Sequence, residues 1–210
     1  VIAPISDAIR TGVVPPYLAG VVALYLAWAT GAAFTLNPLG DEGDVLPVTL
    51  TAPISGREFV AGCCLAGVLV GLPLSVVGAL LAAVFAGSSV SVATGALALA
   101  VVLPVAATGI AAGVGVTLPR FEPVNVTRGR EAVVPSLFGF AVYSVALVLA
   151  ASPGTVVQVA GVRNALADLT GLSTAGTLGA GIGATVVLAA TFATLGFWHA
   201  TRTFDTYYLE

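Results

Sequence analysis

The stretch DEGDVLPVTLTAPISGRE, from Asp41 to Glu58, is a short charged segment between two long runs without charge. Residues 11–40 and 59–119 contain no Asp, Glu, Lys or Arg. A helix needs about 20 apolar residues to cross a bilayer, so the first run has room for one span and the second for two. The segment therefore predicts a loop at a membrane surface, with transmembrane helices on both sides of it.

Two further charge-free runs, residues 132–162 and 169–201, have room for one span each. Only 8% of the 210 residues are charged and the mean hydropathy is +1.07, whereas soluble domains carry about a quarter charged residues. We therefore expect an all-α polytopic transmembrane helix bundle of about five spans, forming a single domain over residues 1–210. The chain contains no Met, so we also expect it to be a fragment of a longer protein, with six spans if an upstream helix is missing.

Turn-forming and charged residues between the apolar runs set the expected limits of the spans. A polar segment at 152–173 predicts a short helix on the face opposite the 41–58 loop. The five expected spans are residues 16–36, 59–85, 91–117, 134–151 and 174–197.

The 41–58 loop itself predicts a short helix lying on the membrane surface. Its acidic start suits a helix N-terminus, and Pro47 is tolerated in a first turn. Pro53 should end this helix. Ser55 and Glu58 have the spacing of a capping box, which predicts that the second span begins there.

Pairs of glycines four residues apart occur in three of the expected spans. Small residues at this spacing let transmembrane helices approach closely, so these glycines are predicted helix-packing positions. The predicted packing glycines are Gly67, Gly71, Gly109, Gly113, Gly179 and Gly183.

With five spans, the 41–58 loop, the 118–131 loop and the C-terminal tail share one side of the membrane. The other side holds Arg10 and Arg163. The side richer in Arg is cytoplasmic, which predicts a multi-pass protein of the cell membrane with both loops and the C-terminus in the cytoplasm. The arginines on that side are Arg57, Arg120, Arg128, Arg130 and Arg202.

The expected spans carry no ionisable residue except His199 at the edge of the last one. Intramembrane enzymes and ion-coupled carriers place ionisable groups inside their spans, so we predict no catalytic residue and no metal site. A nucleotide-binding P-loop needs Lys, which the chain lacks. A membrane scaffold or assembly protein and an intramembrane enzyme are the alternative functions, and the loop itself is either a docking element or a connector that merely separates two helices.

Glu42, the stretch LPVTLTAPISGREF at 46–59 and the following Gly62 resemble the first cytoplasmic loop of ABC-2 type membrane permeases. The stretch LPRFEP at 118–123 is similar to another cytoplasmic loop of that family, whereas Gly56 interrupts the family's usual Ser-Arg pair. The resemblance implies a permease component of an ATP-driven exporter, with no ATPase site of its own.

The family's short loop helix docks on an ATPase subunit, which binds the ATP. The resemblance therefore implies an ABC ATPase subunit, a second permease half or a homodimer, and the lipid bilayer as partners, with no nucleic acid and no cofactor on this chain. The expected contact residues are Glu42, Asp44, Pro53, Arg57 and Glu58 in the first loop, with Arg120, Glu122, Arg128 and Arg130 in the second.

Overall fold

The computed structural model describes residues 13–127 and 130–207, with the backbone alone at 125–127 and 130–132. Predictions that concern Arg10 and Arg128 fall outside the described residues. The elements in chain order are α2 (Leu18–Thr35), the 3-10 helix η1 (Gly43–Val45), α3 (Leu46–Thr51), α4 (Gly56–Phe85), α5 (Val90–Thr117), β1 (Pro123–Thr127), β2 (Arg130–Val133), α6 (Leu137–Val156), α7 (Ala160–Thr170) and α8 (Thr174–Asp205).

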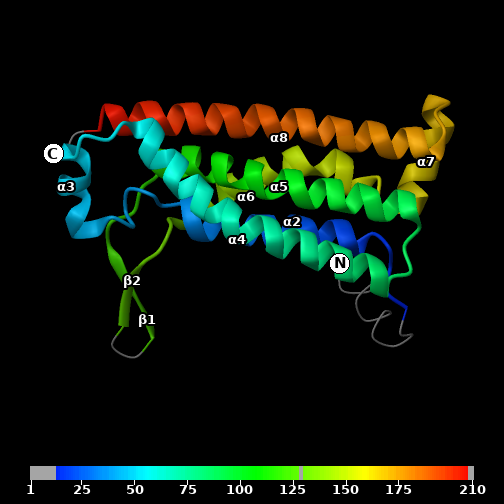
Figure 1. Ribbon diagram of the computed structural model, residues 1–210, viewed down its shortest axis with the longest axis horizontal. Coiled ribbons are helices and arrows are strands. Elements are labelled where there is room, and N and C mark those ends of the chain that lie inside the picture. Colours follow the sequence, from blue (N-terminus) through cyan, green and yellow to red (C-terminus); the bar gives the residue numbers. More distant parts are fainter. Residues whose placement is uncertain (1–12, 128–129, 208–210) are drawn as a thin grey trace.

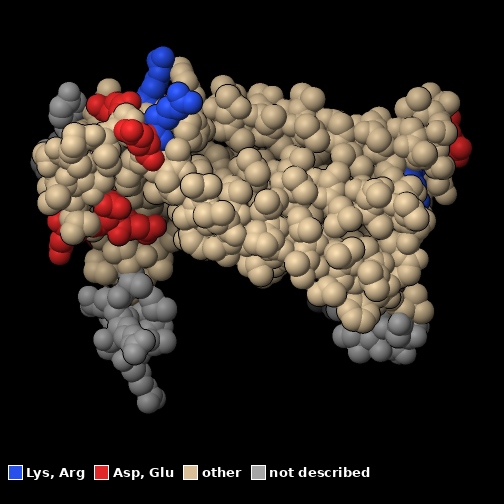
Figure 2. Space-filling model, viewed as in Figure 1, with Lys and Arg blue, Asp and Glu red and all other residues tan. Residues whose placement is uncertain are grey.

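The helices α2, α4, α5, α6 and α8 are long and apolar enough to span a membrane, and they run side by side along the length of the molecule (Figure 1). The predicted all-α bundle of five spans is confirmed. On the face shown in Figure 2, charged side chains lie only near the two ends, and the long middle carries none. Large apolar side chains such as Leu65 and Leu69 are exposed there, as the lipid-facing surface of a multi-pass membrane protein requires.

The two ends of the bundle differ. One end carries α3 and the β1–β2 hairpin and is called the α3 end below; the other carries α7 and is called the α7 end (Figure 1). The short helices α3 and α7 thus lie at opposite ends, as the sequence predicts.

Helix α5 is the centre of the bundle and contacts α2, α4, α6 and α8. Its sequence is rich in Ala and Gly, and the side chains of Ala100, Ala107 and Ala111 are fully buried. Without a hydrophobic driving force between helices in lipid, close backbone approach through small residues is what holds such helices together. The small side chains of α5 therefore explain why four neighbours can pack around it.

Glycine marks the tightest of these helix contacts. A Cβ placed on Gly113 of α5 would clash with the backbone of Gly196 on α8, so neither position has room for a side chain. Gly179 and Gly183 face open space instead, with no described atom within 4 Å of an added Cβ, so the structure gives this pair no packing contact within the chain. The predicted glycines that do lie at helix contacts are Gly67, Gly71, Gly109 and Gly113.

Two spans, α6 and α8, differ in their limits from the prediction. Helix α6 begins at Leu137 because Ser136 caps it, accepting a hydrogen bond from the backbone N–H of Gly139. It then continues to Val156, beyond the predicted end at residue 151. Helix α8 runs on to Asp205, so the residues expected to form a tail after 197 are mostly its last turns.

The 118–131 loop contains an antiparallel two-stranded hairpin that the sequence did not lead us to expect. Pro123 pairs with Val133 and Val124 pairs with Ala132, and the pairing becomes irregular toward the tip. The hairpin projects from the α3 end of the bundle, away from the spans (Figure 1).

Candidate docking face at the α3 end

Segments far apart in the sequence meet at the α3 end. The side chain of Asn37, which follows α2, is fully buried and binds the backbone of Arg120, which follows α5. Its Nδ2 donates to the Arg120 carbonyl at 2.9 Å, and the Arg120 N–H donates to its Oδ1 at 2.9 Å. This paired amide contact fixes the first loop against the second across 83 residues of sequence.

The start of α4 is fixed to the end of α8 in a similar way. The carboxylate of Asp205 accepts a hydrogen bond from the Gly56 N–H at 2.6 Å, and the ring of Phe204 stacks on Phe59 with centroids 4.4 Å apart. Ser55 and Glu58 form the predicted capping box on the same turn. Carboxylates near the first N–H groups of a helix satisfy unpaired donors and suit its positive end, so this junction is well determined.

Helix α3 packs on the ends of the spans through one of its sides only. Leu46 is buried, and Leu50 packs beside it on a cluster that includes Leu39, Val60 and Phe204. This cluster is the hydrophobic base of the α3 end. It joins α3 to both α4 and α8, so a displacement of α3 would be felt by two spans.

The outer side of α3 remains uncovered. Val45, Val48 and Ile54 are 57%, 70% and 40% exposed and form what we call the apolar patch. The patch lies at the α3 end of the bundle, where charged side chains gather, and not on the charge-free middle (Figures 1 and 2). Apolar side chains exposed among charges commonly mark an interaction surface.

Acidic residues precede the apolar patch in the first loop. The first loop carries Asp41, Glu42 and Asp44, and Glu42 is half-buried, with its carboxylate accepting a hydrogen bond from the Thr49 hydroxyl. Desolvation raises the pKa of the Asp41 carboxyl above its ordinary value, with the charge of Glu42 acting in the same direction and the hydrogen bond from Asn37 opposing them. The patch therefore sits in a negative field.

The described contact residues predicted from the sequence all lie at this end. Asp44, Pro53, Arg57 and Glu58 are exposed on the first loop and the start of α4. Figure 2 shows the basic side chains beside this acidic group. In the second loop Arg120 is half-buried and Glu122 is exposed, whereas the side chain of Arg130 is not described.

Sequence reasoning missed Asn37 and Asp205, the two residues that assemble this end. Both carry a weak signal, because each is a polar residue at or next to a helix end. Their partners are backbone groups 83 and 149 residues away, and spacing along the chain does not predict such contacts.

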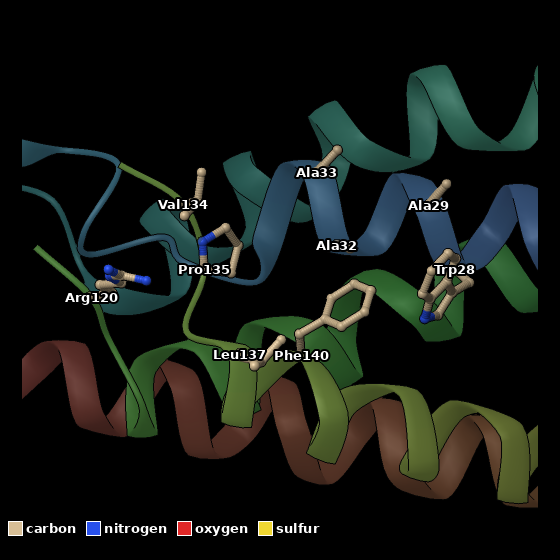
Figure 3. Close-up of a pocket in the computed structure, with 9 residues that line it drawn as sticks. All are labelled: Trp28, Ala29, Ala32, Ala33, Arg120, Val134, Pro135, Leu137 and Phe140. Atoms are coloured by element: carbon tan, nitrogen blue, oxygen red, sulfur yellow. The ribbon is translucent and has the colours of Figure 1, made fainter. Parts of the chain in front are cut away.

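A second feature of this end is an open groove between α2 and α6 with a volume of about 510 Å³ (Figure 3). Trp28 and Phe140 line one part of it, with ring centroids 5.0 Å apart. Arg120 lines the opposite part. The groove therefore has an apolar stretch and one cationic end.

Polar side chains within the spans serve the packing of the described helices. Tyr143 donates to the carbonyl of Trp28, Trp28 donates to the hydroxyl of Ser144, and Thr185 donates to the carbonyl of Ala151, each across a helix contact. Within residues 13–127 and 130–207 no group of three or more His, Cys, Asp or Glu side chains is placed to hold a metal ion. These hydrogen bonds are typical of the interhelical contacts of membrane proteins.

Fold and charge distribution define the class of this protein as a multi-pass α-helical membrane protein. Comparison of the chain with models of protein families, with curated proteins and with solved structures finds no match. The class therefore follows from the long apolar helices and the charge-free middle of the bundle alone.

Proposed function

We propose that the chain is the membrane-spanning permease component of an ATP-driven ABC exporter, and that its ATPase subunit docks on the α3 end. The apolar patch of Val45, Val48 and Ile54, exposed among charges on a helix fixed to two spans, is the observation that carries the proposal. The resemblance of residues 41–62 to the first loop of ABC-2 type permeases supports it. Amphipathic helices that lay an apolar face in a groove are a common mode of protein recognition.

The distribution of arginine supports a cytoplasmic α3 end. Arg57, Arg120 and Arg202 lie there, and the hairpin sequence adds Arg128 and Arg130. The opposite side of the membrane holds only Arg10 and Arg163 in the sequence. Under the positive-inside rule the α3 end faces the cytoplasm, where ATP and an ATPase subunit are available.

In this proposal the chain transmits force and performs no chemistry of its own. ATP binds to the partner subunit, and closure of two ATPase subunits moves α3. The buried cluster to which Leu46, Val60 and Phe204 belong then carries the movement to α4 and α8. A second permease half, or a second copy of this chain, completes the pathway across the bilayer.

The test places a charge in the apolar patch without disturbing the bundle. Val48→Asp changes a side chain that is 70% exposed, and Val90→Asp, at a position 81% exposed at the start of α5, is the matched control at the α7 end. Each variant is purified in mild detergent from its native membrane, and the recovered ATPase activity and the protein that carries it are measured. Burial of one valine side chain is worth about 1.5 kcal/mol or more, so Val48→Asp should reduce ATPase recovery at least about tenfold.

Val90→Asp should retain the ATPase subunit, and circular dichroism should show the same helix content in both variants. Equal recovery of ATPase with Val48→Asp and with the unchanged chain would refute docking on the patch. Recovery of no ATPase with the unchanged chain would refute the exporter assignment and favour a scaffold.

A further inference from the structure

The groove between α2 and α6 has chemically different ends. At one end Trp28 packs against Tyr25 and Phe140, with ring centroids 5.6 and 5.0 Å away. The indole N–H of Trp28 already donates to Ser144 at 2.9 Å, so this end offers apolar contact only. Arg120 lies at the other end, toward the loops (Figure 3).

The backbone of Arg120 is fixed by hydrogen bonds, whereas its side chain takes part in none of them. Both backbone groups of Arg120 are bound by Asn37, which fixes where the side chain starts. Its guanidinium forms no hydrogen bond or ion pair with any residue of the described ranges. No acidic residue is among the described residues that line the groove. A positioned cation therefore faces the groove without a counter-charge from its lining.

The groove extends from the polar end of the bundle into its charge-free part. Trp28 lies seven residues before the end of α2 at Thr35, which corresponds to about 10 Å along the helix axis. Arg120 lies beyond that helix end, beside Asn37. The groove thus runs from the level of the polar end into the charge-free middle of the bundle, where acyl chains surround the protein.

Residues next to the groove face the bilayer. Leu137 and Phe138 at the start of α6 are 83% and 68% exposed, and Tyr25 on α2 is 62% exposed. The groove is open on its outer side between these helices, so a lipid can enter it sideways without crossing the protein.

We propose that the groove binds one anionic phospholipid of the adjacent leaflet. The Arg120 guanidinium pairs with its phosphate, since the planar fork of Arg donors matches phosphate oxygens. One acyl chain lies along Ala29 and Ala33 toward Trp28 and Phe140. Basic pockets between transmembrane helices bind anionic headgroups in this manner. The proposal rests on the membrane fold and does not depend on the docking of an ATPase subunit.

Native mass spectrometry of the full chain in detergent tests the proposal, with phosphatidylglycerol and phosphatidylcholine of identical acyl chains as the probes. Arg120→Gln keeps the backbone contact with Asn37 and a polar side chain but removes the charge. Arg202→Gln is the matched control, because Arg202 lies at the same end of the bundle over the ring of Trp198. Ala33→Phe fills the groove without a change of charge.

The unchanged chain and Arg202→Gln should retain phosphatidylglycerol about tenfold better than phosphatidylcholine, because the choline cation of phosphatidylcholine offsets the charge of the phosphate that Arg120 binds. Arg120→Gln should lose this preference, and Ala33→Phe should lose retention of both lipids at this position. Thermal unfolding checks that each variant is folded before lipid is added.

Equal loss in Arg120→Gln and Arg202→Gln would overturn the proposal, since it would indicate attraction by overall charge. Unchanged retention of phosphatidylglycerol in Ala33→Phe would also overturn it. Equal competition by inorganic phosphate at the same concentration would show an anion site without an acyl chain, and would overturn the assignment of a lipid.

Discussion

Replacement of Asn37 by alanine should weaken the whole α3 end. The asparagine side chain is 0% exposed and supplies both hydrogen bonds to the backbone of Arg120. Its removal leaves a backbone N–H and a C=O without their partner, and each unpaired group that stays buried costs about 1–3 kcal/mol. Partial access of water to the Arg120 backbone reduces this penalty. We therefore expect a loss of about 3 kcal/mol in the free energy of unfolding, or about 6–12 °C in Tm for a chain of this size.

Thermal unfolding of the purified protein, followed by circular dichroism in one detergent and lipid mixture, measures this effect. Asn164→Ala is the matched control, because Asn164 is an exposed asparagine on α7 at the opposite end of the bundle. Its Tm should change by less than about 2 °C, as expected for a surface substitution. A Tm for Asn37→Ala that falls no further than that of Asn164→Ala would refute the structural role assigned to the paired amide contact.

Two other predictions concern helix packing and pH. Gly113→Ala should lower Tm because the new Cβ meets the backbone of Gly196. Gly179→Ala, whose new Cβ meets only open space, should leave Tm unchanged or raise it slightly. An equal change of Tm in the two variants would contradict the close approach of α5 and α8. Because the pKa of Asp41 is raised in the folded protein, this carboxyl contributes to the free energy of unfolding most fully below pH 3.8, its ordinary pKa. That contribution is lost as the pH rises through the pKa of the folded state. Asp41→Asn should therefore be more stable than the unchanged chain at pH 7 and lose that advantage near pH 4, and a constant difference between pH 4 and 7 would contradict the desolvation of this carboxyl.

The number of spans was predictable because charge is segregated along this chain. Nothing in the sequence competes with the rule that charged side chains avoid the hydrocarbon region, so each long charge-free run became one or two helices. The capping box of Ser55 and Glu58 was equally visible, because its partners lie three residues apart. Pro47 and Pro53 placed the short helix of the first loop within one or two residues of its limits.

Helix ends that depend on distant partners were not predictable. α8 passes its predicted end at residue 197 and continues to Asp205, because its last turns pack on α4 and Asp205 binds the Gly56 N–H. The hairpin after Arg120 was missed since its strands are short and one is rich in charge. The groove beside Trp28 depends on how α2 and α6 diverge, which no local pattern encodes.

The forces that hold the bundle and those that hold its α3 end are different in kind. Within the bundle the contacts are small apolar side chains and hydroxyl groups bonded to carbonyls of neighbouring helices, which respond little to salt or pH. At the α3 end, Asp41, Glu58 and Asp205 take part in hydrogen bonds as charged groups, and α3 has only one buried side. Local opening therefore costs least at the end that carries the apolar patch. The docking proposed above requires this division of stability, because in it α3 moves while the five spans stay in register.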